Sequence, residues 1–153
     1  MMDAFARRRF ISVLAGLAAV PLFRGRAAHA AGDPLAPLID KITGGARLQE
    51  GRVKMEIPRL ADNGHSVPLK VSVESPMTAA EHVRSITLLS ERNPRPLMAT
   101  FHLGPKASRA VVGTRVRLNG TQRVLAVAQL SDGSYWSGSA EVEVTESACL
   151  DAS

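Results

Sequence analysis

The sequence predicts an all-β protein, an antiparallel β-sandwich preceded by one short helix. Three observations predict this fold. Beyond residue 50, apolar residues recur at every second position, which is the period of a half-buried strand. Dipeptides that favour turns separate these alternating stretches at short intervals. After residue 30, the one stretch with helical spacing of apolar residues lies before residue 46.

The helix is predicted over residues 33–45. Leu35, Leu38, Ile39 and Ile42 follow three- and four-residue spacing, which places them on one face. The pair Gly44-Gly45 ends the helix, because glycine adopts the left-handed backbone that closes a helix.

The strands are predicted from alternation of apolar and polar residues. The clearest are 53–57, 67–73, 112–118, 124–130 and 140–145, and weaker ones are 83–89 and 97–103. The breaks are Asp62-Asn63-Gly64, Asn93-Pro94, Asn119-Gly120 and Asp132-Gly133, of which the last two are predicted as tight hairpin turns.

About seven short strands at this spacing indicate an immunoglobulin-like antiparallel β-sandwich. With only Phe101, Tyr135 and Trp136 as aromatic residues after residue 30, aliphatic side chains must fill its core. We therefore expect a sandwich domain over residues 31–146 and a C-terminal tail over 147–153.

Composition fits one globular domain. The chain has 153 residues, of which 45% are hydrophobic, and this excludes a disordered chain and a multi-span membrane protein. The single cysteine, Cys149, excludes an internal disulfide and any cysteine-rich zinc or iron–sulfur site.

The formal net charge of +5 comes largely from the N-terminus. Five of the 19 basic residues and one of the 14 acidic residues fall within residues 1–30, so the rest is almost neutral at +1. Nucleic-acid binding requires a basic patch or stripe, and none is evident in the charge pattern. We therefore expect no nucleic-acid partner.

Residues 1–30 have the three parts of an export signal. A basic segment (7–9) precedes an apolar run (10–23), and Ala28-His29-Ala30 has the form of a cleavage site. The run is shorter than the roughly 20 residues that span a bilayer, so we expect no membrane anchor. The segment 7–11 resembles a twin-arginine signal, with ordinary secretion as the alternative, and predicts a periplasmic chain that starts near Ala31.

Motifs for catalysis are missing from the sequence. It contains no phosphate-binding loop, dinucleotide fingerprint or nucleophile elbow. His65, His82 and His102 lack metal-ligand spacing, and the carboxylates alternate with apolar residues as on solvated strand faces. We expect no metal, no cofactor and no enzyme; histidines that meet in space and a carboxylate pair are the alternatives.

Cys149 is the candidate functional residue. An unpaired cysteine in an exported protein suggests a reactive thiol or a bond to another molecule. It follows the last predicted strand, so it belongs to the tail, and a thiol on a tether can enter another protein's active site. The alternative is an incidental tail cysteine.

The sequence resembles the SoxY family, the sulfur-carrier Y subunit of the periplasmic thiosulfate-oxidation (Sox) system. A twin-arginine signal is also usual in that family. The segments that carry the resemblance are 53–58, 61–64, 67–69, 71–78, 93–94, 99–102, 114–118, 126–134 and 140–145.

The resemblance implies a carrier, not an enzyme. Members hold sulfur intermediates covalently on a cysteine near the C-terminus, which corresponds to Cys149 here. They pair with a β-sandwich subunit, SoxZ, and other Sox enzymes load, oxidise and hydrolyse the bound sulfur.

The tail departs from the family pattern. Members end in Gly-Gly-Cys-Gly-Gly, whereas the matching residues 147–151 are Ser-Ala-Cys-Leu-Asp. Loss of glycine predicts a stiffer tail, and the acidic residues Glu146 and Asp151 disfavour a thiolate. The alternative function is therefore a diverged periplasmic binding or scaffold module that has lost carrier chemistry.

Overall fold

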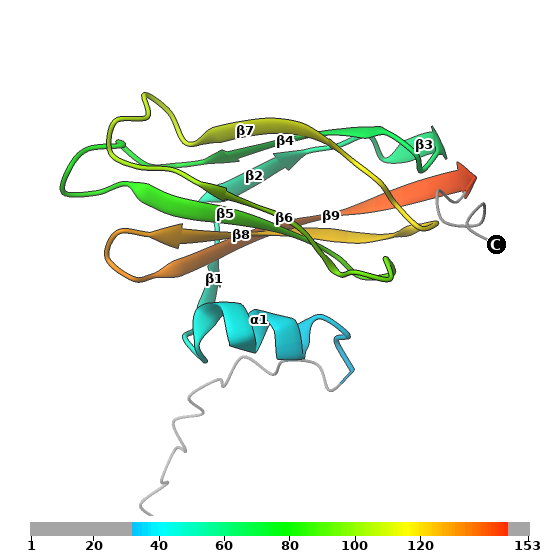
Figure 1. Ribbon diagram of the computed structural model, residues 1–153, viewed down its shortest axis with the longest axis horizontal. Helices are drawn as coiled ribbons and strands as arrows, with labels where there is room; N and C mark the ends of the chain where they lie inside the picture. Colours follow the sequence, from blue (N-terminus) through cyan, green and yellow to red (C-terminus); the bar gives the residue numbers. More distant parts are fainter. Residues whose placement is uncertain (1–31, 147–153) are drawn as a thin grey trace, which may run out of the picture.

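The computed structural model describes residues 32–146, and it confirms the predicted sandwich (Figure 1). The larger sheet has the order β1-β9-β8-β5-β6, with β3 also pairing with β9, and the smaller sheet has the order β2-β4-β7. The strands are β1 (Leu48–Glu50), β2 (Val53–Glu56), β3 (Leu60–Asn63), β4 (Val67–Val73), β5 (Val83–Ser90), β6 (Leu97–His102), β7 (Val111–Val116), β8 (Gln122–Leu130) and β9 (Tyr135–Glu146).

Helix α1 (Ala36–Thr43) packs on the outer face of the larger sheet (Figure 1). Its apolar face buries Leu35 and Ile39 against Leu89, Leu125 and Val127 of the sheet. The helix ends as predicted, because Gly44 has a left-handed backbone (φ 63°). Among the described residues, no helix is long and apolar enough to cross a bilayer.

The core between the two sheets is aliphatic, as predicted. In β4, Val67, Leu69, Val71 and Val73 are buried, while Pro68 and Lys70 between them are exposed. Full burial of a valine or leucine side chain contributes about 1.5–3 kcal/mol. The period of two in the sequence therefore identifies the inner face of this strand correctly.

The predicted hairpin at Asp132-Gly133 is confirmed, but the one at Asn119-Gly120 is wrong. Gly133 has φ 84°, and β8 and β9 pair antiparallel on either side of it. The turn at Asn119-Gly120 instead carries the chain from β7 in one sheet to β8 in the other. The Asn119 N–H donates to Asn93 Oδ1 at 2.9 Å, so the turn is bonded to a neighbouring loop and not across a hairpin.

The last strand is longer than predicted, and two short strands were not predicted. Strand β9 begins at Tyr135, five residues before the predicted start. Strands β1 and β3 pair with its two ends in parallel, so the sheet is not wholly antiparallel. Asp62 and Asn63, predicted as part of a turn, lie in β3. The segments of β1 (LQE) and β3 (LADN) do not alternate apolar and polar residues, and their partners lie far away in sequence.

The two sides of the sandwich differ. On the closed side, β2 approaches β9 so tightly that a Cβ on Gly138 would lie 2.5 Å from the carbonyl oxygen of Val53. On the open side, β6 and β7 end their respective sheets, and within residues 32–146 neither has a strand partner beyond it.

Candidate functional site

Cys149 lies outside the described residues, but the structure describes the point from which its segment continues. This point is Glu146, the last residue of β9. The Gly64 N–H donates to the Glu146 carbonyl at 2.7 Å, and the Thr145 hydroxyl donates to the Asp62 carbonyl. Strand β3 and the residue after it therefore hold the end of β9.

A second loop secures the same end of the sandwich. The Leu118 N–H donates to the Gly64 carbonyl at 2.8 Å, and the Val144 N–H donates to Thr121 Oγ1 at 3.0 Å. The loop between β7 and β8 is thus hydrogen-bonded both to the loop between β3 and β4 and to the end of β9. The backbone is fixed up to three residues before the cysteine.

Acidic side chains gather at this end of β9. Glu143 and Glu146 are exposed on the strand, and Asp62 is exposed on the neighbouring β3. Negative charge near a thiol favours its protonated form. The described part of the site therefore anchors the tail but offers no electropositive group from β9 that would promote a thiolate.

The three histidines lie in separate places. His82 Nδ1 is 3.1 Å from the Thr78 carbonyl, before β5, whereas His102 ends β6 and His65 follows β3. Within residues 32–146, no three histidine, cysteine or carboxylate side chains are grouped so that they could hold a metal ion.

A polar cluster that sequence reasoning missed attaches the N-terminal segment to the larger sheet. Arg123 on β8 donates to Asp33 Oδ1 at 2.7 Å and lies 3.9 Å from Glu91 Oε1. The hydrogen bond that Arg123 donates to Asp33 is the main cause that raises the pKa of Arg123. No sequence signal could have found this pair, because its members are 90 residues apart.

A second cluster lies at the β8–β9 hairpin, at the other end of β9 from the tail. The Arg52 guanidinium lies 4.9 Å from the ring centre of Trp136 and forms a 2.7 Å ion pair with Glu81. The Trp136 indole donates to Ser134 Oγ at 3.0 Å. The Ser134 hydroxyl and backbone N–H donate to Asp132 and lower the pKa of that carboxyl. This cluster stabilises the hairpin.

The distribution of charge differs from the sequence-based expectation. Outside residues 1–30 the net charge is small, but the region that forms β6, β7 and the loop between them is strongly basic. Between residues 92 and 117 the chain has no acidic side chain and six basic ones: Arg92, Arg95, Lys106, Arg109, Arg115 and Arg117. The expectation of no basic stripe is therefore wrong, because the topology places this acid-free segment along one side of the sandwich.

Solved structures with similar folds include a SoxY protein and several superoxide reductases. The sulfur carrier protein SoxY from Chlorobium limicola f thiosulfatophilum aligns with a TM-score of 0.62 and 26% identity, covering 72% of this chain and 91% of that chain. Superoxide reductase (neelaredoxin) from Ignicoccus hospitalis aligns with a TM-score of 0.55 and 21% identity, covering 61% and 80%. Superoxide reductase from Nanoarchaeum equitans aligns with a TM-score of 0.52 and 14% identity, covering 63% and 100%.

At these identities, the likeness to the superoxide reductases concerns the fold alone. No curated protein matches the chain. The family model of sulfur oxidation protein SoxY matches residues 39–149, which is most of the chain and includes Cys149. This chain belongs to the SoxY family of sulfur oxidation proteins.

Proposed function

We propose that this chain is a periplasmic sulfur carrier that holds sulfur intermediates covalently on Cys149 during thiosulfate or sulfur oxidation. One observation carries the proposal: the match to the SoxY family extends to Cys149. The sulfur carrier SoxY from Chlorobium limicola, similar in fold and sequence, supports it.

The arrangement at the end of β9 suits such a role. Glu146 is held by the hydrogen bond from Gly64, and Cys149 is the third residue after it. An extended chain spans at most about 3.3–3.6 Å per residue, so the thiol can stand roughly 10 Å from this anchor. That reach would let the thiol enter the active site of another protein while the sandwich stays outside.

In this role the chain performs no turnover itself. The Cys149 thiolate is the atom that bonds to sulfur. Joining it to the outer sulfur of thiosulfate releases two electrons, which the Sox enzyme that loads the carrier must accept, and other Sox enzymes process the bound group. A SoxZ-like subunit is the structural partner, in a heterodimer or larger complex. No cofactor or metal takes part in our proposal.

The central test is the variant Cys149→Ser. We expect it to abolish sulfur adducts, measured by mass spectrometry of the protein from sulfur-grown cells, and to abolish sulfur-dependent oxidation. Folding and binding to a SoxZ-like subunit should be unchanged, because the substituted atom lies beyond β9. Sulfur oxidation at the wild-type rate by the serine variant contradicts the carrier function.

The changed tail sequence supports a second function, a binding or scaffold module without carrier chemistry. Ser147, Ala148, Leu150 and Asp151 stand where the family has glycine. If the wild-type protein carries no adduct under any growth condition, this alternative is favoured. It is strengthened if restoring the four glycines creates carrier activity that the wild type lacks.

Export is a further part of the proposal. We expect residues 1–30 to be removed as a twin-arginine signal, so that N-terminal sequencing of the periplasmic protein starts near Ala31. Replacing Arg7 and Arg8 with lysine should block export by this route. A cytoplasmic protein that retains residues 1–30 contradicts the proposed location.

A further inference from the structure

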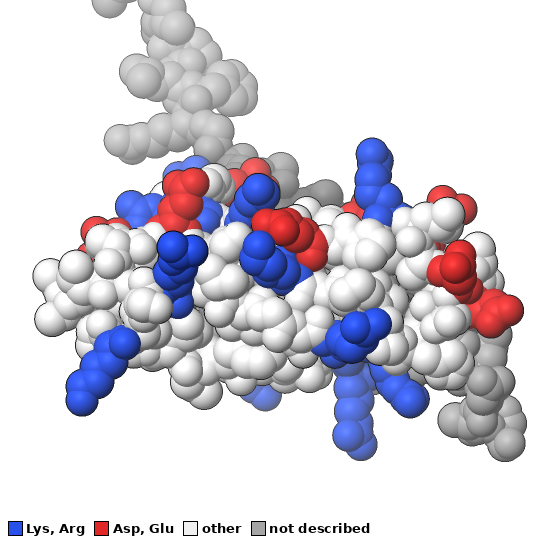
Figure 2. Space-filling view, turned by 90° about the horizontal axis from the view of Figure 1, so that it is seen from above, with Lys and Arg blue, Asp and Glu red and all other residues white. Residues whose placement is uncertain are grey.

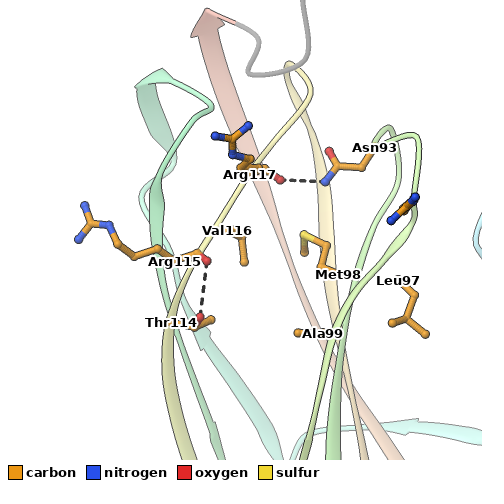
Figure 3. Close-up of a pocket in the computed structure, with 9 residues that line it drawn as sticks. Asn93, Leu97, Met98, Ala99, Thr114, Arg115, Val116 and Arg117 are labelled. Atoms are coloured by element: carbon orange, nitrogen blue, oxygen red, sulfur yellow. Dashed lines mark hydrogen bonds between the residues drawn. The ribbon is translucent and has the colours of Figure 1, made fainter. Parts of the chain in front are cut away.

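The open side of the sandwich has a groove between its two edge strands. The groove has a volume of about 350 Å³ and is lined by residues of β6, β7 and the loops at their ends (Figure 3). Met98 and Val116 face each other within it, whereas Leu97 and Arg115 point outward on either side. At one end, Asn93 Nδ2 donates to the Arg117 carbonyl at 2.8 Å and links the two strands' loops.

This side of the molecule is uniformly basic. The six basic residues between positions 92 and 117 belong to β6, β7 and their flanking loops, and no acidic residue lies among them. Figure 2, which views the molecule from above the smaller sheet, shows basic side chains without acidic ones along its lower edge. Along the upper edge acidic and basic side chains are mixed, and acidic ones lie at the right-hand end.

Unlike Arg52 and Arg123, the arginines of the groove form no ion pair among the described residues. Arg52 and Arg123 are each within 2.7 Å of a carboxylate oxygen. Within residues 32–146, by contrast, Arg95, Arg115 and Arg117 have no carboxylate partner, and Arg115 is held only by a 2.7 Å hydrogen bond to Ser66. All three side chains are exposed, so their charges are accessible to another molecule.

The same side also exposes apolar surface and unpaired backbone. Leu97 on β6 and Val111 on β7 are 44% and 42% exposed, which is high for large hydrophobic residues. Because β6 and β7 end their sheets, each has one row of backbone N–H and C=O groups without a strand partner in the described chain. An edge of this kind is a template for an added strand.

We propose that the open side, formed by β6, β7 and the groove between them, docks an extended acidic segment of a partner protein. Carboxylates of that segment would pair with Arg95, Arg115 and Arg117. Its backbone would add to a free sheet edge, and its apolar side chains would cover Leu97 and Val111. Nucleic acid fits less well, because the one phenylalanine of these strands, Phe101, packs against the core and is only partly exposed for stacking.

The first probe is a SoxZ-like subunit from the same organism, a choice that rests on the proposed function. We compare Arg95→Glu/Arg117→Glu with the matched control Lys41→Glu/Arg47→Glu, which makes the same charge change at exposed residues of α1 and the loop after it. We expect the groove variant to bind at least about tenfold more weakly than the control, as measured by titration calorimetry. Wild-type affinity should also fall as salt rises from about 50 to about 500 mM.

If the two variants bind the SoxZ-like subunit with equal affinity, the proposed docking surface is wrong, although the SoxZ-like subunit is still the partner. The proposal is also wrong if the groove variant loses solubility but not affinity, since the arginines would then only protect the edge strands from aggregation. Circular dichroism and melting of each variant control for folding.

If the wild-type protein does not bind the SoxZ-like subunit, the partner in the proposed function is wrong, and a second probe decides the inference. This probe is a peptide of about eight residues with alternating glutamate and valine, long enough for one strand. We expect NMR amide shifts confined to β6 and β7, and weaker binding by the groove variant. No shifts there, or an equal response to a lysine–valine peptide or to an oligonucleotide, overturns the proposal.

Discussion

The closed and open sides of this sandwich are both formed by edge strands, but only on the closed side do strands of the two sheets pack closely against each other. On the closed side, β2 lies against β9, and Gly138 permits the close approach to Val53. Strands β1 and β3 also cover β9 at its two ends. On the open side, β6 and β7 are left as edges, with positive charge along them.

This difference indicates that the closed side contributes mainly to the stability of the fold, whereas the open side is available to bind a partner. Close backbone contact with β2 and pairing with β1 and β3 hold β9 in place on the closed side. Charge on an edge strand keeps it soluble and unpaired until an oppositely charged partner arrives. Substitutions on the closed side should therefore change stability, while those on the open side should change binding.

The largest expected effect on stability is that of Gly138→Ala. A Cβ there would lie 2.5 Å from the Val53 carbonyl oxygen, which is backbone and cannot turn aside. Strand β2 must move away from β9, and we expect a loss of about 1–3 kcal/mol in the free energy of unfolding, measured by urea denaturation.

The matched control is Gly113→Ala on β7, where an added Cβ meets nothing within 4 Å. Alanine restricts the unfolded chain, so this variant should be unchanged or more stable by about 0.4–1 kcal/mol. Equal destabilisation by both substitutions would mean that the closed side is no more tightly packed than the open side.

A smaller effect is expected for Thr121→Val, which keeps the shape of the side chain but removes its hydroxyl. The Val144 N–H then loses its acceptor at 3.0 Å, close to the end of β9. We expect a loss of about 1 kcal/mol, together with faster amide hydrogen exchange at Val144. Unchanged exchange there would show that Thr121 does not secure the base of the tail.

The sequence predicts those elements whose signal is local. The alternation in β4 and the glycine pair after α1 depend on residues next to one another, and both predictions are confirmed. Strands β1 and β3 escaped prediction because they are short and pair with β9, about 80 to 90 residues away in the chain.

The functional residues show the same limit. Cys149 could be proposed by counting from the last strand, and its geometry stays outside the described residues. The acid-free segment 92–117 is visible in the sequence, but only the topology shows that it forms one side of the sandwich. The net charge over the whole chain therefore does not reveal the positive charge that gathers on the side formed by β6 and β7.

The smallest effect on stability is expected at the hairpin between β8 and β9, and this effect depends on pH. The hydroxyl and backbone N–H of Ser134 donate to Asp132 and lower its pKa from the usual 3.8. The ionised carboxylate therefore stabilises the fold above that usual value, and this stabilisation is lost as pH falls through the lower folded-state pKa. Because Asp132 is exposed, solvent screens most of the effect.

We expect Asp132→Asn to lower the melting temperature slightly at pH 7, with the difference from wild type shrinking below about pH 4. Asp40→Asn is the control, since it makes the same substitution at an exposed aspartate of α1, away from the hairpin. A difference for Asp132→Asn that stays constant from neutral to acidic pH would show that the carboxylate's charge does not hold the hairpin, and that the closed side depends on backbone packing alone.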